Sequence, residues 1–478
     1  MKIPSLNTRL FVAISLGMLL VGCSMAPTYE RPSSPVADRI GNTSAAVAST
    51  QQFQHSWNSF VRSEQLRALV ETALENNRDL RVSMLNVDVA RATYRIQNAD
   101  RFPSLSATAD NTRQRTPANL NGTSNSQITQ SATAGVRLSS FEVDLFGRLA
   151  SLSNAAQEEY FAVQSNADAA RLILVSEVIN TYIQYNSKLQ QKDFAAQTLS
   201  AREQAFELTL IRQKNGIAHE LEFQDAKGLA ENARAENARL TRELEQARNA
   251  LQILAGVSSI SEFLPATADR TDIVNESFLS AVSSEVLLAR PDVIAAEHQL
   301  KARNADIGAA RAAFFPSITL TGLYGSSSTE FSNLFKSGQE SWSFTPQVSL
   351  PIFSAGKLRA DVDVANLRKD IAVANYEASI QTAFGDVANA ITAISTNAIE
   401  ADALKKQAES ALETQRLTEL RYQSGIDDQL RYLDAQRSAW SALVSAVEAH
   451  ANKATAQVAL FKALGGNWVN DPQIVGRN

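Results

Sequence analysis

The chain has 478 residues, of which 44% are hydrophobic and 20% charged, and its formal net charge is −5. This acidic balance, with no basic stripe, excludes a nucleic-acid-binding surface. After the N-terminal segment no stretch holds about 18 uninterrupted apolar residues, so we expect no membrane-spanning helix, and any membrane-spanning part must consist of strands.

No constellation of catalytic residues is present in the sequence. The four histidines stand far apart, and the chain has no HExxH, GxxxxGK[ST] or GxSxG motif. A function must be argued from a site, and none of these sites exists here. We therefore expect neither an enzyme nor a metal centre.

Residues 1–22 have the layout of a bacterial lipoprotein signal peptide. Lys2 and Arg9 precede a short apolar run from Leu10 to Leu20, and Val21-Gly22 then lead to Cys23, the single cysteine of the chain. The run is too short for a transmembrane helix, and an ordinary signal peptide would not need a thiol at this place. We expect the mature chain to begin at Cys23, acylated with diacylglycerol and palmitate and with no other cofactor. Ser24 in place of aspartate indicates the outer membrane of a Gram-negative cell.

One internal repeat with a period of about 210 residues runs through the mature chain. Pro103 and Pro316 are 213 residues apart, whereas Gly147 and Gly356 are 209 apart. Each repeat is expected to hold a helix, a β-hairpin and a long helical hairpin. The predicted organisation is a signal peptide (1–22), a lipid-anchored tether with an equatorial segment (23–60), a first repeat (61–270), and a second repeat with a C-terminal equatorial segment (271–478).

Alternating apolar and polar residues predict two strands in each repeat, at 105–110, 136–146, 318–324 and 344–352. Residues 325–328, rich in glycine and serine, are predicted to form a loop after the third strand. Val136 and Leu138 are out of phase with Phe141, which indicates a β-bulge near Ser139 and Ser140. Soluble hairpins packed on a core remain an alternative, since periodicity alone does not exclude them.

Four strands are too few to close a membrane barrel, and an open sheet edge cannot face lipid. The barrel must then be shared between chains. Two chains would give a narrow barrel filled by its own side chains, so a duct favours a homotrimer with twelve strands.

Each β-hairpin is followed by a long stretch almost free of glycine and proline, at 148–215 and 357–424. At 1.5 Å per residue each stretch could form a helix of roughly 100 Å. Gly216 and Gly425 are predicted to end these helices as C-caps. The returning helices are predicted at 217–255 and 426–464. A cytoplasmic coiled-coil rod is the alternative that composition alone favours.

The last helix carries an apolar stripe in which Arg437 is the only charged residue. Leu430, Asp434 and Arg437 share one helical face, and Asp434 can reach Arg437 at i+3. A solvated helix face explains most pairs of this kind. The matching residues of the first repeat are Leu221, Asp225 and Gly228.

Several motifs together resemble the outer membrane factors of tripartite efflux and secretion systems, the TolC family, and within it the lipid-anchored OprM-like branch. The resemblance covers nearly the whole mature chain and rests on Cys23-Ser24, Pro27-x-Tyr29-x-Arg31-Pro32, Trp57 to Phe60 with Leu66 and Leu69, Phe141 to Gly147, Leu288-x-Arg290-Pro291-Asp292, Phe315-Pro316-Ser317 and Leu433 to Ser438.

The resemblance implies a mixed α and β membrane protein, a trimeric 12-stranded outer-membrane β-barrel continued by a 12-helix periplasmic α-barrel with an equatorial belt. It also implies passive export of drugs or other small molecules, powered by a separate inner-membrane pump of the RND class that is joined through a periplasmic adaptor. An exit duct for protein secretion and a structural lipoprotein with a helical rod remain alternatives.

The resemblance further assigns Leu430 and Asp434 to a constriction at the periplasmic end, where three copies of Asp434 would form an acidic ring. Because only the second repeat has an arginine at this face, we expect the second hairpin to move and the first to hold. The residues expected at the tips, for gate tethering or adaptor contact, are Arg212, Gly216, Arg421, Tyr422 and Gly425.

Overall fold

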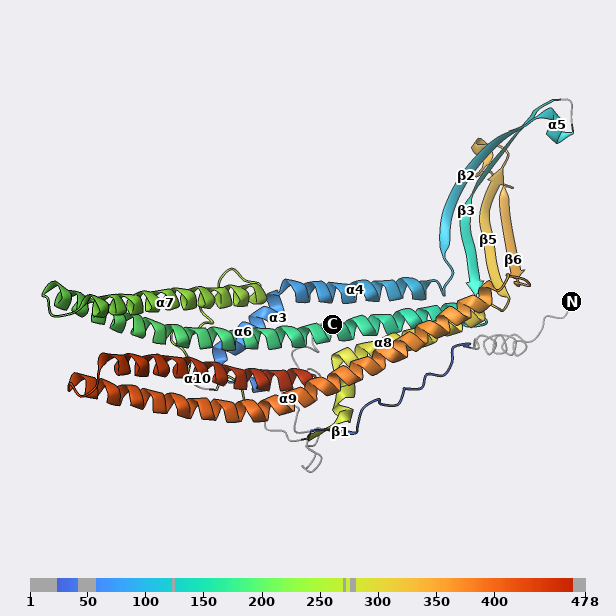
Figure 1. Cartoon of the computed structure of the whole chain (residues 1–478). Helices are drawn as coiled ribbons and strands as arrows, with labels where there is room; N and C mark the ends of the chain where they lie inside the picture. The colour runs from blue at the N-terminus through green and yellow to red at the C-terminus, as the bar shows by residue number, and fades with distance from the viewer. Residues whose placement is uncertain (1–23, 42–56, 123–124, 270–271, 276–280, 467–478) are drawn as a thin grey trace. The chain divides into compact units, whose positions relative to one another are not determined.

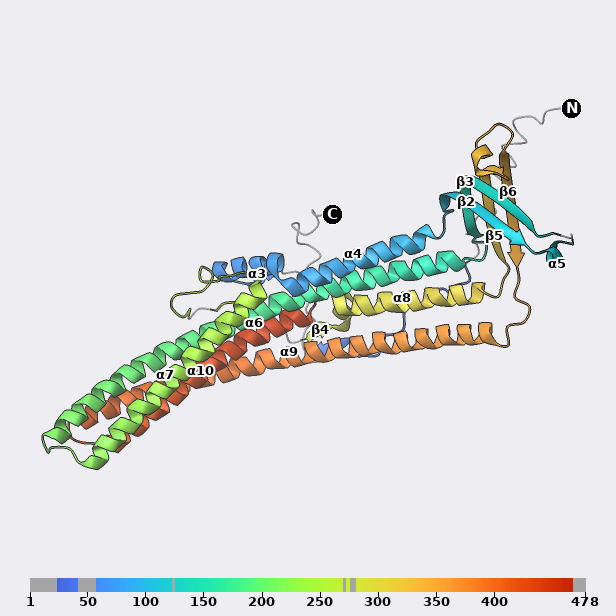
Figure 2. The same cartoon turned by 90° about the horizontal axis from the view of Figure 1, so that it is seen from above.

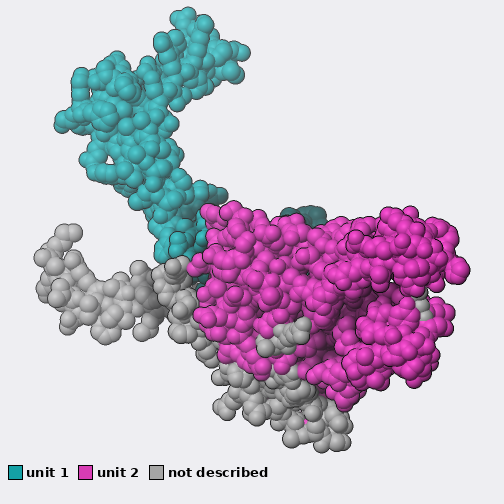
Figure 3. All heavy atoms as spheres, turned by 90° about the vertical axis from the view of Figure 1, so that its left-hand side faces the viewer, with its two compact units in different colours: residues 1–32, 86–163, 295–376 teal, residues 33–85, 164–294, 377–478 magenta. Residues whose placement is uncertain are grey.

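The computed structural model describes residues 24–41, 57–122, 125–269, 272–275 and 281–466. The signal peptide and Cys23 lie outside the described residues. The chain divides into two compact units, coloured in Figure 3. The first comprises Met1–Pro32, Asn86–Val163 and Ala295–Tyr376, and the second comprises Ser33–Leu85, Gln164–Ile294 and Glu377–Asn478. Each sequence repeat contributes residues to both units, so the division into units does not coincide with the boundary between the repeats.

The first unit contains a four-stranded antiparallel sheet in the order β2-β3-β5-β6 (Figure 1). Its strands are β2 (Leu105–Thr116), β3 (Gln127–Val143), β5 (Ser317–Ser328) and β6 (Glu340–Ser349). All four predicted strands are therefore present. β2 ends six residues later than predicted, whereas β3 begins nine residues earlier and ends three residues earlier than predicted. The last strand ends at Ser349, three residues before its predicted end.

The prediction of a loop at 325–328 is wrong, because these residues continue β5. Gly325 pairs with Gly135 on β3 and with Ser341 on β6. A Cβ atom at Gly325 would lie 2.1 Å from the carbonyl oxygen of Ala134, and one at Gly135 would lie 2.4 Å from that of Tyr324. Here the glycines mark a close approach of two strand backbones rather than a turn.

The predicted bulge is confirmed, since the β3–β5 register shifts between Leu138 and Phe141 and Ser140 has a φ of 41°. Across the bulge Leu138 pairs with Gly322 and Phe141 with Leu320. The extra residue thereby returns the apolar side chains of β3 to one face of the sheet. By register that face also carries Ile318, Tyr324, Trp342, Phe344 and Val348.

The opposite face of the sheet is polar. Arg137 and Asp110 project from this face and form an ion pair across β2 and β3. Thr319 and Thr321 on β5 face the same side as Gln347 and Thr345 on β6. The sheet is thus amphipathic, with an apolar face and a polar face, as expected for strands that separate lipid from a water-filled lumen.

The second unit contains most of two antiparallel helical hairpins (Figures 1 and 2), whose long helices begin with residues 148–163 and 357–376 of the first unit. The helices are α6 (Arg148–Lys214) with α7 (Glu220–Ala255), and α9 (Lys357–Gln423) with α10 (Gln429–Ala463). Both long helices match their predicted extents within one residue. The returning helices begin three residues later than predicted, because residues 217–219 and 426–428 form the turn and the N-cap.

The core of the second unit lies where the short helix α3 (Glu64–Asn76) packs against α7, in a hydrophobic cluster shared with α6 and α10. Ser63 caps α3 by accepting a hydrogen bond from the backbone amide of Leu66. Leu66 and Leu69 are fully buried and share a hydrophobic cluster with Val175 and Ile179 of α6. The same cluster holds both hairpins, because it also includes Leu251 of α7 and Val458 of α10. Within the described residues no helix is long and apolar enough to cross a membrane.

Candidate functional site

The two hairpin turns share one backbone geometry. Gly216 and Gly425 follow α6 and α9 with φ values of 71° and 72°, which confirms both predicted C-caps. The carbonyl oxygen of Arg212 accepts a hydrogen bond from the amide of Ile217 at 2.8 Å, and the matching bond to Arg421 is 2.9 Å long. These are Schellman motifs, in which glycine supplies the left-handed residue.

The second turn adds a set of charged side-chain contacts. Arg421 binds both carboxylate oxygens of Asp427, at 2.7 and 3.0 Å, and Arg431 approaches the same carboxylate at 3.5 Å. The hydrogen bond from Arg421 lowers the pKa of the Asp427 carboxyl, and the same bond raises the pKa of Arg421. Asp428 then caps α10, because its Oδ1 accepts a hydrogen bond from the amide of Arg431.

The first turn lacks these contacts. Ala218 stands where the second turn has Asp427, and His219 at the N-cap of α7 makes no capping bond with its side chain. Among the described residues, the Arg212 side chain has no ion pair or hydrogen bond in the structure. The turn is instead held by Glu220, which accepts hydrogen bonds from Gln213 at 2.6 Å and from Gln224 at 2.7 Å.

A pair of stacked tyrosines completes the second turn. The rings of Tyr422 and Tyr432 lie 5.5 Å apart between centroids, with 6° between their planes. Sequence reasoning selected Arg421 and Tyr422 but missed their partners, Asp427 and Tyr432. A signal for Asp427 was available, because it follows Arg421 by six residues and the first repeat has alanine at the matching position.

The three residues predicted for a constriction share one face near the start of α10. Asp434 and Arg437 form an ion pair of 2.9 Å, which confirms the predicted i+3 contact. Their side chains are 56% and 80% exposed, and Leu430 is 68% exposed. An ion pair as exposed as this contributes little stability by itself. The exposed leucine and the exposed pair are therefore available to other chains or to a channel lumen.

A cavity of about 680 Å³ brings residues of both hairpins together in the second unit. Leu430, Asp434 and Arg437 line it from α10, and their counterparts Asp225 and Gly228 line it from α7. Figure 3 looks onto the side of the hairpin turns and shows the second unit hollowed on this side. The structure thus places both versions of the repeated motif around one space.

In the first unit, the segment that follows Cys23 in sequence is fastened to α8 (Pro291–Ala312). Arg31 and Tyr29 both donate hydrogen bonds to the carboxylate of Glu297, which Lys301 approaches at 3.3 Å. Asn304 donates a hydrogen bond of 2.7 Å to the carbonyl oxygen of Pro27. We call residues 24–31 the strap.

The Glu297 side chain is only 9% exposed, so its charge needs these partners. Burial alone would raise the pKa of its carboxyl, but the hydrogen bond from Arg31 and the nearby Lys301 charge hold that pKa below its ordinary value. Burial and the adjacent carboxylate raise the pKa of Tyr29. The carboxylate is therefore ionised at neutral pH and holds the strap in place.

Within the described residues, no group of three or more histidine, cysteine, aspartate or glutamate side chains is arranged to hold a metal ion. The features available for function are thus the amphipathic sheet, the two tips, the cavity and the strap.

Comparisons with known proteins place these features in context. The family description "Outer membrane efflux protein" fits residues 69–257 and 282–466, and each stretch lies within one sequence repeat. The chain is 46% identical over 461 residues to outer membrane protein OprJ of Pseudomonas aeruginosa, covering 96% of this chain and 95% of OprJ. It is 40% identical over 460 residues to TtgC of Pseudomonas putida, described as a probable efflux pump outer membrane protein, covering 94% of each.

A solved structure agrees with this likeness. The open state of the MtrE outer membrane channel of Neisseria gonorrhoeae superposes with a TM-score of 0.83 at 38% identity, over 93% of this chain and 98% of MtrE. The fold class predicted from the sequence is thus the fold of a known outer membrane channel.

Proposed function

This chain belongs to the outer membrane efflux protein family, and we propose that it is the passive exit duct of a tripartite pump that carries drugs or other small molecules out of a Gram-negative cell. The observation that carries the proposal is the joining of an amphipathic four-stranded sheet to two long helical hairpins in one chain. The sheet provides the membrane part, and the hairpins provide a tunnel wall. The energy for export comes from an inner-membrane pump, of the RND class, through a periplasmic adaptor.

The proposed duct is a homotrimer. Within the described residues, β2 and β6 are the edges of the sheet, and each pairs with a strand on one side only. An unpaired edge in lipid leaves backbone groups without partners, at a cost of several kcal/mol for each group. Three sheets that join β6 of one chain to β2 of the next close a twelve-stranded barrel. Chemical cross-linking in detergent should yield a ladder that ends at three chains, and a folded monomer that inserts into bilayers would contradict this assembly.

The proposed membrane anchor is a lipid on Cys23, in the outer membrane. It is supported by the strap, because the chain is clamped to α8 a few residues after Cys23, at Pro27, Tyr29 and Arg31. Replacing Cys23 with serine should abolish labelling with radioactive palmitate, while the barrel still inserts through its strands. Persistent labelling of the Cys23→Ser protein would refute the anchor.

The proposed gate consists of three copies of Leu430, Asp434 and Arg437 around the channel axis. Like charges of Asp434 repel as the pore narrows, and the adjacent Arg437 offsets this repulsion. The tip residues Arg212, Gly216, Arg421, Tyr422 and Gly425 are proposed to contact the adaptor. Because each exposed pair is weak, adaptor contacts at the tips suffice to shift the equilibrium between closed and open states.

Planar-bilayer recording tests the proposed function as a whole. Purified protein should show channels of low open probability whose conductance rises when Asp434 and Arg437 are both replaced with alanine. Protein that inserts but never conducts, with or without these substitutions, would support a structural lipoprotein instead.

A further inference from the structure

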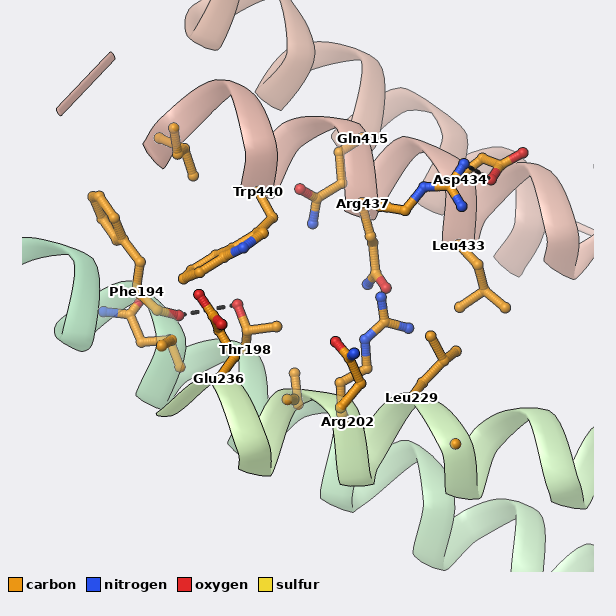
Figure 4. Close-up of a pocket in the computed structure, with 18 of the residues that line it drawn as sticks. Phe194, Thr198, Arg202, Leu229, Glu236, Gln415, Leu433, Asp434, Arg437 and Trp440 are labelled. Atoms are coloured by element: carbon orange, nitrogen blue, oxygen red, sulfur yellow. Dashed lines mark hydrogen bonds and ion pairs between the residues drawn. The ribbon is translucent and has the colours of Figure 1, made fainter. Parts of the chain in front are cut away.

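The cavity between the hairpins holds more chemistry than the gate residues account for. Side chains enter it from α6, α7, α9 and α10 (Figure 4). In Figure 4, Arg202 extends from α6 with its guanidinium group in the space between the hairpins, and Trp440 reaches into the same space from α10. Its volume of about 680 Å³ lies within the range of pockets that hold organic small molecules.

Most of the charged groups around the cavity are already paired. Asp434 pairs with Arg437, and Glu236 pairs with Arg239 on its own helix. Asp225 is exposed, so water solvates its carboxylate. These contacts leave one lining residue, Arg202, whose charge is neither paired nor fully exposed.

Arg202 is half-buried, and among the described residues it has no ion pair and no side-chain hydrogen bond. Its burial lowers the pKa of the guanidinium group, an effect that the nearby Tyr432 partly opposes. A partly desolvated cation without an anion is unfavourable, and binding an anion relieves that cost. The second repeat has alanine at the matching position, 411, so this cation is a feature of the first hairpin alone.

Part of the cavity wall is apolar and aromatic, and amide side chains such as Gln197 and Gln415 line the rest. Phe194 contributes from α6 and Trp440 from α10, with Leu229 and Leu433 on facing helices. Aromatic walls favour a flat apolar body, and a guanidinium fork favours a carboxylate, which it binds through two parallel hydrogen bonds. The ligand that fits both features is an amphiphilic carboxylate.

We propose that this cavity is a binding site for amphiphilic organic carboxylates, with Arg202 binding the carboxylate and Trp440 and Phe194 contacting the apolar body. The proposal rests on the proposed efflux function, because it names one substrate class that pauses beside the gate. An occupant would lie against Asp434 and Arg437, so its presence and the state of the gate are coupled.

The direct test is isothermal titration of the full-length, detergent-solubilised protein with 1-naphthoate. An uncharged analogue, 1-naphthalenemethanol, and a cationic analogue, 1-naphthylmethylammonium, serve as matched probes. Naphthoate should bind most tightly, and Arg202→Gln should weaken its binding by about tenfold or more, the loss expected for one charged hydrogen-bond partner. Arg242→Gln, which changes an exposed arginine of α7 outside the cavity, should leave the affinity unchanged. Naphthoate uptake that neither substitution alters is partition into the micelle.

A Trp440→Leu variant separates the aromatic contact from the charge, because it should weaken naphthoate and naphthalenemethanol by a similar factor. Equal naphthoate binding by the Arg202→Gln and unaltered proteins would overturn the proposal, as would tighter binding of the ammonium probe. Channel recordings on the same samples distinguish a failure of the binding-site proposal from a failure of the proposed duct function. Normal conductance without selective naphthoate binding rejects only the binding site, whereas absence of conductance in the unaltered protein rejects the duct.

Discussion

The two hairpin turns have the same backbone but different side chains. Both end a 67-residue helix with a left-handed glycine and a Schellman bond to an arginine carbonyl. Only the second turn adds the Arg421–Asp427 bridge, the Asp428 cap and, further along α10, the Asp434–Arg437 pair. The fold therefore requires the glycines in both repeats, whereas the charges of the second repeat are free to serve another purpose.

This difference supports the proposal that the two hairpins carry different roles. The buried cluster around α3 includes residues of both hairpins, among them Val175 of α6 and Val458 of α10, so the difference between the hairpins lies toward their tips. The first tip is held by the Glu220 carboxylate, which accepts hydrogen bonds from the side-chain amides of Gln213 and Gln224. The second hairpin carries charges at its tip and along the proposed gate. Charged contacts on an exposed surface are weak and readily exchanged, which suits a part that must change partners as the channel opens.

The largest expected effect concerns the feature that the turns share. Replacing Gly216 or Gly425 with valine forces a β-branched residue into the left-handed region, at a cost of about 1 to 3 kcal/mol per chain. Thermal unfolding of the trimer should show a similar drop for both variants. A drop for only one of them would break the equivalence of the two backbones.

The next effect addresses the difference between the hairpins. Replacing Asp434 and Arg437 with alanine should raise the open probability, because three exposed pairs at ~0 to 1 kcal/mol each bias the closed state by at most a few kcal/mol. The control is Asp225→Ala, which should do much less, since Gly228 offers Asp225 no partner at i+3. Single-channel recordings in which both variants open equally would contradict the asymmetric gate.

A smaller effect is expected from pH at the second tip. The pKa of Asp427 is lowered by Arg421, so its stabilising contribution is complete above the ordinary carboxyl pKa of about 4 and is lost as pH falls through the lower folded value. Protection of the amides of residues 426–431 against hydrogen exchange should fall at strongly acid pH. Asp427→Asn should show the same reduced protection at neutral pH, and that substitution should leave the protection of residues 217–222 unchanged.

The smallest effect comes from giving the first hairpin what it lacks. Gly228 lies on α7 with open space around it, so an arginine fits there and raises helix propensity by up to about 1 kcal/mol. Gly228→Arg should pair with Asp225 and slightly lower the open probability. Gly228→Ala supplies the control for helix propensity alone, and equal recordings from the two variants would rule out the charge pair.

The sequence was sufficient for the features that depend on local periodicity. The long helices, the glycine caps, the bulge near Ser140 and the Asp434–Arg437 pair all follow from spacing along one or two elements. The end of β5 was misassigned because glycine and serine favour turns, and the close approach of Gly135 and Gly325 involves residues 190 positions apart in the sequence.

The same limit explains the site residues that were missed. Arg202, Phe194 and Trp440 meet only because two hairpins from different repeats pack together, and no local spacing signals that meeting. Glu297 reads as an ordinary surface glutamate, and its burial follows from contacts with a strap 266 residues earlier in the sequence.

The central claim is that the second hairpin moves while the first one holds, and distances between labelled tips test it most directly. Asn215 and Ser424 are both exposed, each precedes its turn glycine, and each donates a hydrogen bond to the carbonyl four residues before it. Either residue can be replaced with a spin-labelled cysteine, since acylation is proposed to occupy the only native thiol, at Cys23. Pulsed electron resonance on the trimer should show that distances between Ser424→Cys labels lengthen when Asp434 and Arg437 are replaced with alanine, while distances between Asn215→Cys labels stay the same. Equal lengthening at both tips, or lengthening only at Asn215→Cys, would contradict the account.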